Sequence, residues 1–155
     1  MDTGSTYCVL DKSIAADFFK PHSQSPIKVS DINGVTTAYS LVSIHRIRIG
    51  DITQPNVNAI VMDLKHGLLG SIEDEPIDGI LGMNFLKGRS FTWEPLTQSI
   101  LWNVTPLLGR QLPIDYSETN LPTLKLSVGK NVFQVDLDTG AATGLSVPAQ
   151  IIKTD

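Results

Sequence analysis

The chain has one cysteine, no long hydrophobic run and no strongly basic segment, and each shortage excludes a class of protein. Cys8 is the single cysteine among 155 residues, so no internal disulfide can form, and its apolar neighbours predict a small buried residue. No apolar stretch approaches the roughly 18 residues of a bilayer-spanning helix, so we expect no membrane span. The net charge of −4 and the lack of a basic patch argue against a nucleic-acid partner.

Signatures of other catalytic and cofactor-binding proteins are also missing. The sequence contains no G-x-S-x-G, no G-x-G-x-x-G and no Walker loop. His22, His45 and His66 are scattered without the spacing of metal ligands. The acidic spacing at residues 136–140 lacks the later glycine and glutamate that a calcium loop needs. We therefore expect neither a metal nor a cofactor.

What the sequence does contain is mostly β-strand patterning. An apolar content of 41% with 18% charged residues is typical of a globular domain. Residues 26–52 hold extended runs on either side of Asn33-Gly34, which predicts a hairpin. Helix is predicted only over residues 11–19, with Asp11 as N-cap, and over one or two turns in 82–88. Short strands with frequent turns predict a closed or sandwiched β-fold.

The character of the chain changes between residues 106 and 120. Two prolines, a glycine and the lack of periodicity predict a linker there. After it, alternating residues from Leu124 to Val128, a turn at 129–131 and a run from Val132 to Leu137 predict a β-hairpin. The organisation expected is a first unit over 1–105, a linker over 106–120 and the start of a second unit over 121–155.

A repeat connects the two units. The tripeptide Asp-Thr-Gly occurs at residues 2–4 and again at 138–140, each time behind a hydrophobic residue and before a small one. A hairpin precedes the second copy, whereas only Met1 precedes the first. We therefore expect the chain to be truncated, with a first unit lacking its N-terminal strands and a second unit lacking its later part.

A further motif makes the repeat specific. Residues 76–86 read PIDGILGMNFL, in which Ile80-Leu81-Gly82 opens a predicted short helix about eighty residues after the first repeat. Together these motifs resemble the aspartic peptidases, especially the retropepsin-like branch in its duplicated, two-unit form. The resemblance implies a mainly β, retropepsin-like closed barrel or sandwich with one or two short helices. It also implies an endopeptidase that acts on a polypeptide without a cofactor.

The resemblance assigns matching roles to the two repeats. The aspartates would share a water, one as general base and the other keeping a proton, which is the established behaviour of aspartic peptidases. The threonines would hydrogen-bond across the junction, and the glycines would allow close approach of the backbone. The residues concerned are Asp2 and Asp138, Thr3 and Thr139, and Gly4 and Gly140.

The resemblance also assigns supporting roles. Ser5 would donate a hydrogen bond to Asp2, and Ala141 cannot donate one to Asp138, so the site would be asymmetric. Ile80-Leu81-Gly82 would pack beneath the first repeat. The hairpin at Asn33 and Gly34 lies where the family has its substrate-covering flap, with Tyr39 as the covering side chain or as an ordinary cross-strand aromatic.

Two alternatives stay open at this point. The chain is either an active aspartic endopeptidase or a catalytically inactive retropepsin-like module for dimerisation or peptide binding. The hairpin at 121–137 is expected to complete the sheet of the first unit, either within one chain or by strand exchange in a homodimer.

Overall fold

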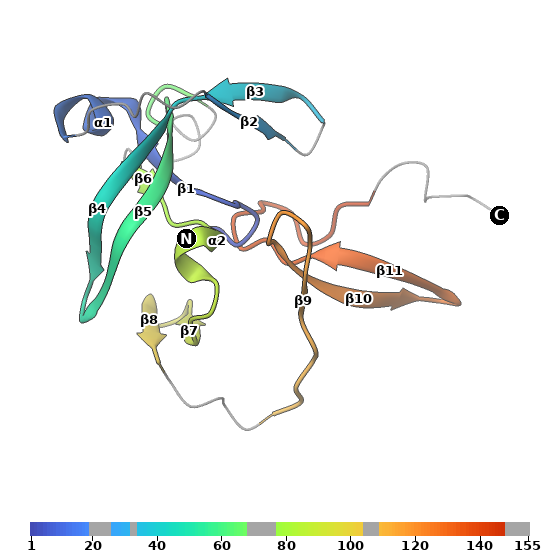
Figure 1. Ribbon diagram of the computed structural model, residues 1–155. Helices are drawn as coiled ribbons and strands as arrows, with labels where there is room; N and C mark the ends of the chain where they lie inside the picture. The colour runs from blue at the N-terminus through green and yellow to red at the C-terminus, as the bar shows by residue number, and fades with distance from the viewer. Residues whose placement is uncertain (19–25, 32–33, 68–76, 104–108, 148–155) are drawn as a thin grey trace.

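The computed structural model describes residues 1–18, 26–31, 34–67, 77–103 and 109–147 (Figure 1). The chain is mainly β with two short helices, as predicted. No helix in these ranges is long and apolar enough to cross a membrane. In chain order the elements are β1 (Cys8–Asp11), α1 (Lys12–Phe18), β2 (Ile27–Ser30), β3 (Thr36–Tyr39), β4 (Leu41–Ile49), β5 (Ile52–Met62), β6 (Gly79–Ile80), α2 (Met83–Leu86), β7 (Phe91–Glu94), β8 (Ser99–Trp102), β9 (Asp115–Tyr116), β10 (Pro122–Val128) and β11 (Asn131–Asp136).

The largest sheet is built around β1 and has the order β4-β5-β1-β6. β1 runs parallel to β5 and antiparallel to β6, and β4 forms a long antiparallel hairpin with β5. Successive side chains of β1 point to opposite faces, so Cys8 packs in one buried cluster and Val9 in another. Burial on both faces explains why the sequence there is a continuous apolar run.

The two clusters form the hydrophobic core. The larger one joins the sheet to α2, and the prediction that Cys8 is buried is confirmed. The smaller one lies on the other side of β1, where the β2–β3 hairpin also packs. The buried members of the larger cluster are Cys8, Val42, Ile52, Val57, Ala59, Met83, Phe85 and Leu86, and those of the smaller are Val9, Ile60 and Leu64.

The closed barrel that the sequence suggested is not found in the described residues. β4 and β6 are the edges of the four-stranded sheet, and the other strands form the separate sheets β11-β10-β9, β2-β3 and β7-β8. A barrel closes only when its edge strands pair in a staggered register. No described strand connects β4 to β6, so the sheet is open.

Both predicted hairpins are confirmed. β2 pairs with β3 from Ile27–Tyr39 to Ser30–Thr36, and β10 pairs with β11 over the register Thr123–Asp136 to Val128–Asn131. Gly34 and Gly129 lie in the turns with φ of +79° and +60°, a conformation that glycine adopts without strain. Asn33 lies outside the described residues.

The predicted linker is only partly irregular. Its residues 115–116 form β9, which pairs with the start of β10. The β10–β11 hairpin therefore belongs to a three-stranded sheet of its own, and no described strand of the four-stranded sheet pairs with it. In the described residues the hairpin does not pair with the four-stranded sheet of its own chain, and strand exchange between two chains stays a prediction.

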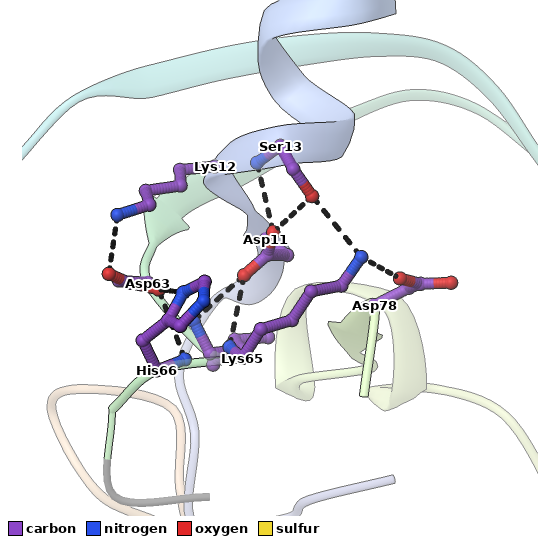
Figure 2. A network of polar contacts seen from close by, with 8 residues as sticks. Asp11, Lys12, Ser13, Asp63, Lys65, His66 and Asp78 are labelled. Atoms are coloured by element: carbon purple, nitrogen blue, oxygen red, sulfur yellow. Dashed lines mark hydrogen bonds and ion pairs between the residues drawn. The ribbon is translucent and has the colours of Figure 1, made fainter. Parts of the chain in front are cut away.

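Asp11 joins the end of β1 to two other segments (Figure 2). As the predicted N-cap of α1, its Oδ1 accepts from the Ser13 amide at 2.9 Å and from the Ser13 hydroxyl. Its Oδ2 accepts from the amides of Leu64 at 2.9 Å and Lys65 at 3.2 Å, in the turn after β5. The Asp11 amide donates to the Asp78 carbonyl at 2.9 Å, just before β6.

The ends of the segment between β5 and β6 are thus fixed together. Lys65 also forms an ion pair with the Asp78 carboxylate at 2.8 Å. Burial alone would raise the pKa of Asp11, but the hydrogen bonds from Ser13, Lys65 and Leu64 outweigh it and hold the pKa well below its usual range. Asp11 is therefore an ionised structural carboxylate.

We expect Asp11→Asn to lower the free energy of unfolding by about 1–3 kcal/mol. The side-chain NH2 of asparagine would face groups that donate to Asp11, such as the amides of Leu64 and Lys65, and would leave them without an acceptor. Because the pKa of Asp11 is lowered in the folded state, its ionised form stabilises the fold at pH values above 3.8. This stabilisation is lost only as the pH falls through the folded pKa. Chemical denaturation at neutral pH and in strong acid measures both effects. Asp63→Asn, at a carboxylate that pairs with Lys12 and His66 on the surface, is the control and should lose less. Equal losses for both variants would contradict the assignment.

Candidate active site

The two Asp-Thr-Gly loops have the same local conformation. The first loop (residues 2–4) leads into β1, and the second loop (residues 138–140) follows β11. In each, the glycine amide donates to the aspartate Oδ1 at 2.8 Å. In each, the next amide, of Ser5 or Ala141, approaches the aspartate carbonyl at 3.4 Å. Each aspartate side chain is thus held by the turn of its own loop.

The threonines join the loops by reciprocal hydrogen bonds. The Thr3 amide donates to Thr139 Oγ1 at 3.1 Å, and the Thr139 amide donates to Thr3 Oγ1 at 3.0 Å. Each hydroxyl then donates to the backbone just before the opposite loop, Thr3 to the Leu137 carbonyl at 2.6 Å and Thr139 to the Met1 carbonyl at 3.3 Å. The pattern relates the loops by a local two-fold axis, although they lie at distant points of the chain.

The glycines allow the loops to meet face to face. A Cβ added at Gly140 would lie 2.7 Å from Cγ of Asp2, and one added at Gly4 would collide with the Asp138 carboxylate. Each carboxylate therefore lies against the glycine of the opposite loop. Both positions need glycine because any side chain would displace a carboxylate.

The carboxylates interact with each other. Burial raises the pKa of Asp2, and the hydrogen bond with the Asp138 carboxyl and its negative charge raise it further. The Gly4 amide opposes this only in part. Asp2 is half-buried, whereas Asp138 is exposed. Burial and the facing carboxyl therefore favour the protonated form of Asp2.

The motif Ile80-Leu81-Gly82 supports the first loop from below. The Asp2 amide donates to the Leu81 carbonyl at 2.9 Å, and the Met83 amide at the start of α2 donates to the Ser5 carbonyl at 2.7 Å. A Cβ at Gly82 would collide with the Tyr7 carbonyl. The motif thus lies directly against the backbone of the first loop, as the resemblance implied.

Asn84 is a positioning residue that the sequence did not single out. Its side-chain Oδ1 accepts from the Cys8 amide at 2.8 Å, and its Nδ2 donates to the Asn58 carbonyl at 2.6 Å. Asn84 therefore ties α2 to both β1 and β5. The available signal was a polar residue inside an apolar helix, Met83 to Leu86, which is consistent with many other roles.

The role expected for Ser5 is wrong. Its hydroxyl donates to the Tyr7 carbonyl at 2.8 Å instead of to Asp2. A hydroxyl carries one proton, and the turn after the first loop brings a nearby carbonyl within its reach. Ala141 has no hydroxyl, as expected, so the asymmetry of the site comes from the burial of Asp2 and not from Ser5.

The proposed flap does not meet the loops in the described residues. Tyr39 packs against the smaller core cluster, with Val9, Ile60 and Leu64, in the manner of a cross-strand aromatic. No atom lies within 4 Å of a Cβ built on Gly34. Neither residue is hydrogen-bonded to either loop among the contacts described.

A cavity of about 450 Å³ adjoins the second loop. It lies between α2 with β7 on one side and β9 with β10 on the other, and its walls are mostly apolar. Thr3, Asp138 and Thr139 reach it from the loops, while Leu86, Phe91, Ile114, Tyr116 and Pro122 form much of the rest. No three His, Cys, Asp or Glu side chains come together as a metal site in the described part of the chain.

Comparison with known proteins identifies the class. A family model described as aspartyl protease matches residues 1–85, which is more than half of the chain and includes the first loop and Ile80-Leu81-Gly82. The chain therefore belongs to the aspartyl protease family. No curated protein and no solved structure matches it.

The close approach of the loops gives a prediction. We expect Gly140→Ala to lower the free energy of unfolding by about 1–3 kcal/mol, because the new methyl group meets the Asp2 carboxylate. Gly144→Ala is the matched control, since no atom lies within 4 Å of its Cβ position and its φ is not positive. Thermal or chemical unfolding of both variants measures the difference. An unchanged stability of Gly140→Ala would mean that the loops do not meet in this way.

Proposed function

We infer that the chain is the catalytic part of an aspartic endopeptidase, with Asp2 and Asp138 as the catalytic pair. The observation that carries this proposal is the reciprocal hydrogen bonding between Thr3 and Thr139. It brings one carboxylate from each loop to a common junction, and membership of the aspartyl protease family supports the same chemistry.

The burial of Asp2 supports an assignment of roles within the pair. In the proposed mechanism Asp138, the exposed carboxylate, acts as the general base and takes a proton from a water molecule, whose oxygen attacks the carbonyl carbon of the peptide bond. Asp2 gives its proton to the carbonyl oxygen, and the product of these two steps is a tetrahedral intermediate. Asp138 then passes the proton that it took from water to the leaving nitrogen, and the carbon–nitrogen bond breaks. As the carboxylic acid product forms, a hydroxyl of the intermediate returns a proton to Asp2. The apparent pKa values of such a pair belong to both groups together.

We assign the two aspartates to two units of one duplicated scaffold, over residues 1–105 and 121–155. The equal hydrogen-bonding patterns of the first and second loops support this reading. The first loop is held in place by more backbone contacts than the second, because Leu81 and the start of α2 are hydrogen-bonded to it. The substrate class is a polypeptide, and the apolar cavity beside Asp138 suits an apolar side chain near the bond that is cleaved.

Substitution of either aspartate tests the assignment. Asp2→Asn and Asp138→Asn should each reduce cleavage of an unfolded protein at acidic pH by at least about a hundredfold, because each removes one proton-transfer group. A statine-type transition-state mimic should inhibit the unsubstituted chain. Asp136→Asn, two residues from Asp138 on the exposed side of β11, is the control and should remain active. Cleavage that survives Asp2→Asn would contradict the proposal, and a folded chain without activity would favour the inactive binding module.

The pH dependence provides a separate test. Because the pKa of Asp2 is raised, Asp2 keeps its proton in acid and loses it as the pH rises toward neutrality. We expect kcat/KM to be highest at acidic pH and to fall as the pH rises through the range where the pair loses this proton. Measurement of kcat/KM across the acidic and neutral range gives the profile. An activity that increases up to alkaline pH would exclude a shared-proton mechanism.

A further inference from the structure

The short helix α2 supports the first loop at its start and ends at Lys87. The Met83 amide donates to the Ser5 carbonyl at 2.7 Å, directly after the first loop. The next amide, of Asn84, donates to the Thr6 carbonyl at 3.0 Å. The Lys87 amide donates to the Met83 carbonyl at 2.9 Å and closes the helix. The backbone of Lys87 is therefore fixed relative to the first loop.

The side chain of Lys87 contacts the three-stranded sheet that carries the second loop. Its Nζ donates to Asn120 Oδ1, in the turn before β10. The same Nζ lies 4.6 Å from the centre of the Tyr116 ring, on β9. An ammonium group at this distance from an aromatic face is attracted by the electrons of the ring. Two separate groups of one sheet thus hold the ammonium of Lys87.

Residues 117–121, which we call the docking turn, connect β9 to β10 and have a defined conformation of their own. The Asn120 amide donates to the Ser117 carbonyl at 2.9 Å, and the Leu121 amide donates to Ser117 Oγ at 3.0 Å. The docking turn also contacts the first part of the chain directly. The Thr6 hydroxyl donates to the Thr119 carbonyl at 3.2 Å, and Leu121 packs against the larger core cluster.

A short series of hydrogen bonds connects the docking turn to the second loop. Pro122 follows the turn, and its carbonyl accepts from the Leu137 amide at 2.8 Å. The Leu137 carbonyl accepts from the Thr3 hydroxyl at 2.6 Å, and Asp138 is the next residue along the chain. A shift of the docking turn therefore moves the start of β10 and, with it, the backbone that carries Asp138.

We propose that Lys87 is a positioning residue, which holds Asp138 in place opposite Asp2 by way of the docking turn. The proposal rests on the proposed function of the two aspartates as a catalytic pair. The reciprocal threonine bonds join the loops at one place, and a single attachment lets the two sheets tilt relative to each other. Lys87 and the docking turn attach them at a second place and oppose this tilt. A misplacement of about 1 Å in a reacting group can cost roughly a hundredfold in rate.

Steady-state kinetics of the whole chain test the proposal. Lys87→Met removes the ammonium but keeps an apolar stem, and it should lower kcat roughly tenfold, by more than it raises KM. Lys87→Arg should recover most of the loss, because a guanidinium also donates hydrogen bonds and stacks on aromatic rings. Lys125→Met is the matched control, since this lysine is exposed on β10, and it should leave kcat unchanged. Equal rates for the two methionine variants, or no recovery by arginine, would overturn the proposal.

A second variant removes the partner of Lys87 instead. Asn120 has a φ of +66°, which glycine adopts without strain, so Asn120→Gly keeps the docking turn and removes only the acceptor. This variant should also lower kcat. In the double variant kcat should equal that of Lys87→Met alone, because both substitutions break the same contact. Losses that add in full would show that the two residues act independently and would overturn the proposal.

Amide hydrogen exchange separates this proposal from the proposed function. The Thr139 amide, which donates to Thr3 Oγ1, should exchange roughly tenfold faster in Lys87→Met than in Lys125→Met. Where circular dichroism shows that Lys87→Met is unfolded, Asn120→Gly takes its place. The measurement needs no catalysis, so an unsubstituted chain that cleaves no peptide bond contradicts the proposed function alone. Exchange of the Thr139 amide at an unchanged rate would overturn the positioning role of Lys87.

Discussion

The reciprocal hydrogen bonding of Thr3 and Thr139 is the interaction on which the site depends. Two ionised carboxylates about 4 Å apart repel each other by about 4 kcal/mol at an effective dielectric constant near 20. Each of the four threonine hydrogen bonds contributes only about 0.5–1.5 kcal/mol. The two quantities are of the same order, so the threonine hydrogen bonds can offset the repulsion between the carboxylates, and a proton on Asp2 reduces that repulsion further. The geometry of the loops and the raised pKa of Asp2 are therefore two aspects of one arrangement.

The supports of the two loops differ, and this difference makes the site asymmetric. The first loop rests on the Leu81 carbonyl and on the start of α2, which Asn84 ties to β1 and β5. The second loop is attached through β11, where the Leu137 amide donates to the Pro122 carbonyl at 2.8 Å, and Asp138 remains exposed. Burial therefore acts on one aspartate more than on the other. Identical tripeptides therefore lie in different surroundings.

Much of the fold and the core of the site followed from local sequence patterns. Glycine turns, apolar alternation and the N-cap at Asp11 are short-range signals, so the hairpins and helices could be predicted. The pairing of Asp2 with Asp138 followed from the repeat. The choice of the Ser5 hydroxyl between Asp2 and the Tyr7 carbonyl depends on the exact turn, and the bridging role of Asn84 depends on tertiary contacts. Whether a sheet stays open or closes into a barrel depends on pairing between strands that are distant in sequence. Local sequence patterns therefore could not show that this sheet is open.

The fold shifts the pKa values of Asp2 and Asp11 in opposite directions, because burial is outweighed by hydrogen-bond donors only at Asp11. The Asp11 carboxylate is buried, yet it accepts four hydrogen bonds, from the amide and hydroxyl of Ser13 and the amides of Leu64 and Lys65, and its pKa is lowered. Burial and the facing Asp138 carboxyl raise the pKa of Asp2, and the hydrogen bond from the Gly4 amide opposes this only in part. Because its pKa lies well below the usual range, the Asp11 carboxylate keeps its charge in mild acid, where a carboxylate with an ordinary pKa begins to lose it. The donors around Asp11 therefore keep this structural carboxylate ionised under the acidic conditions in which we propose that Asp2 and Asp138 act.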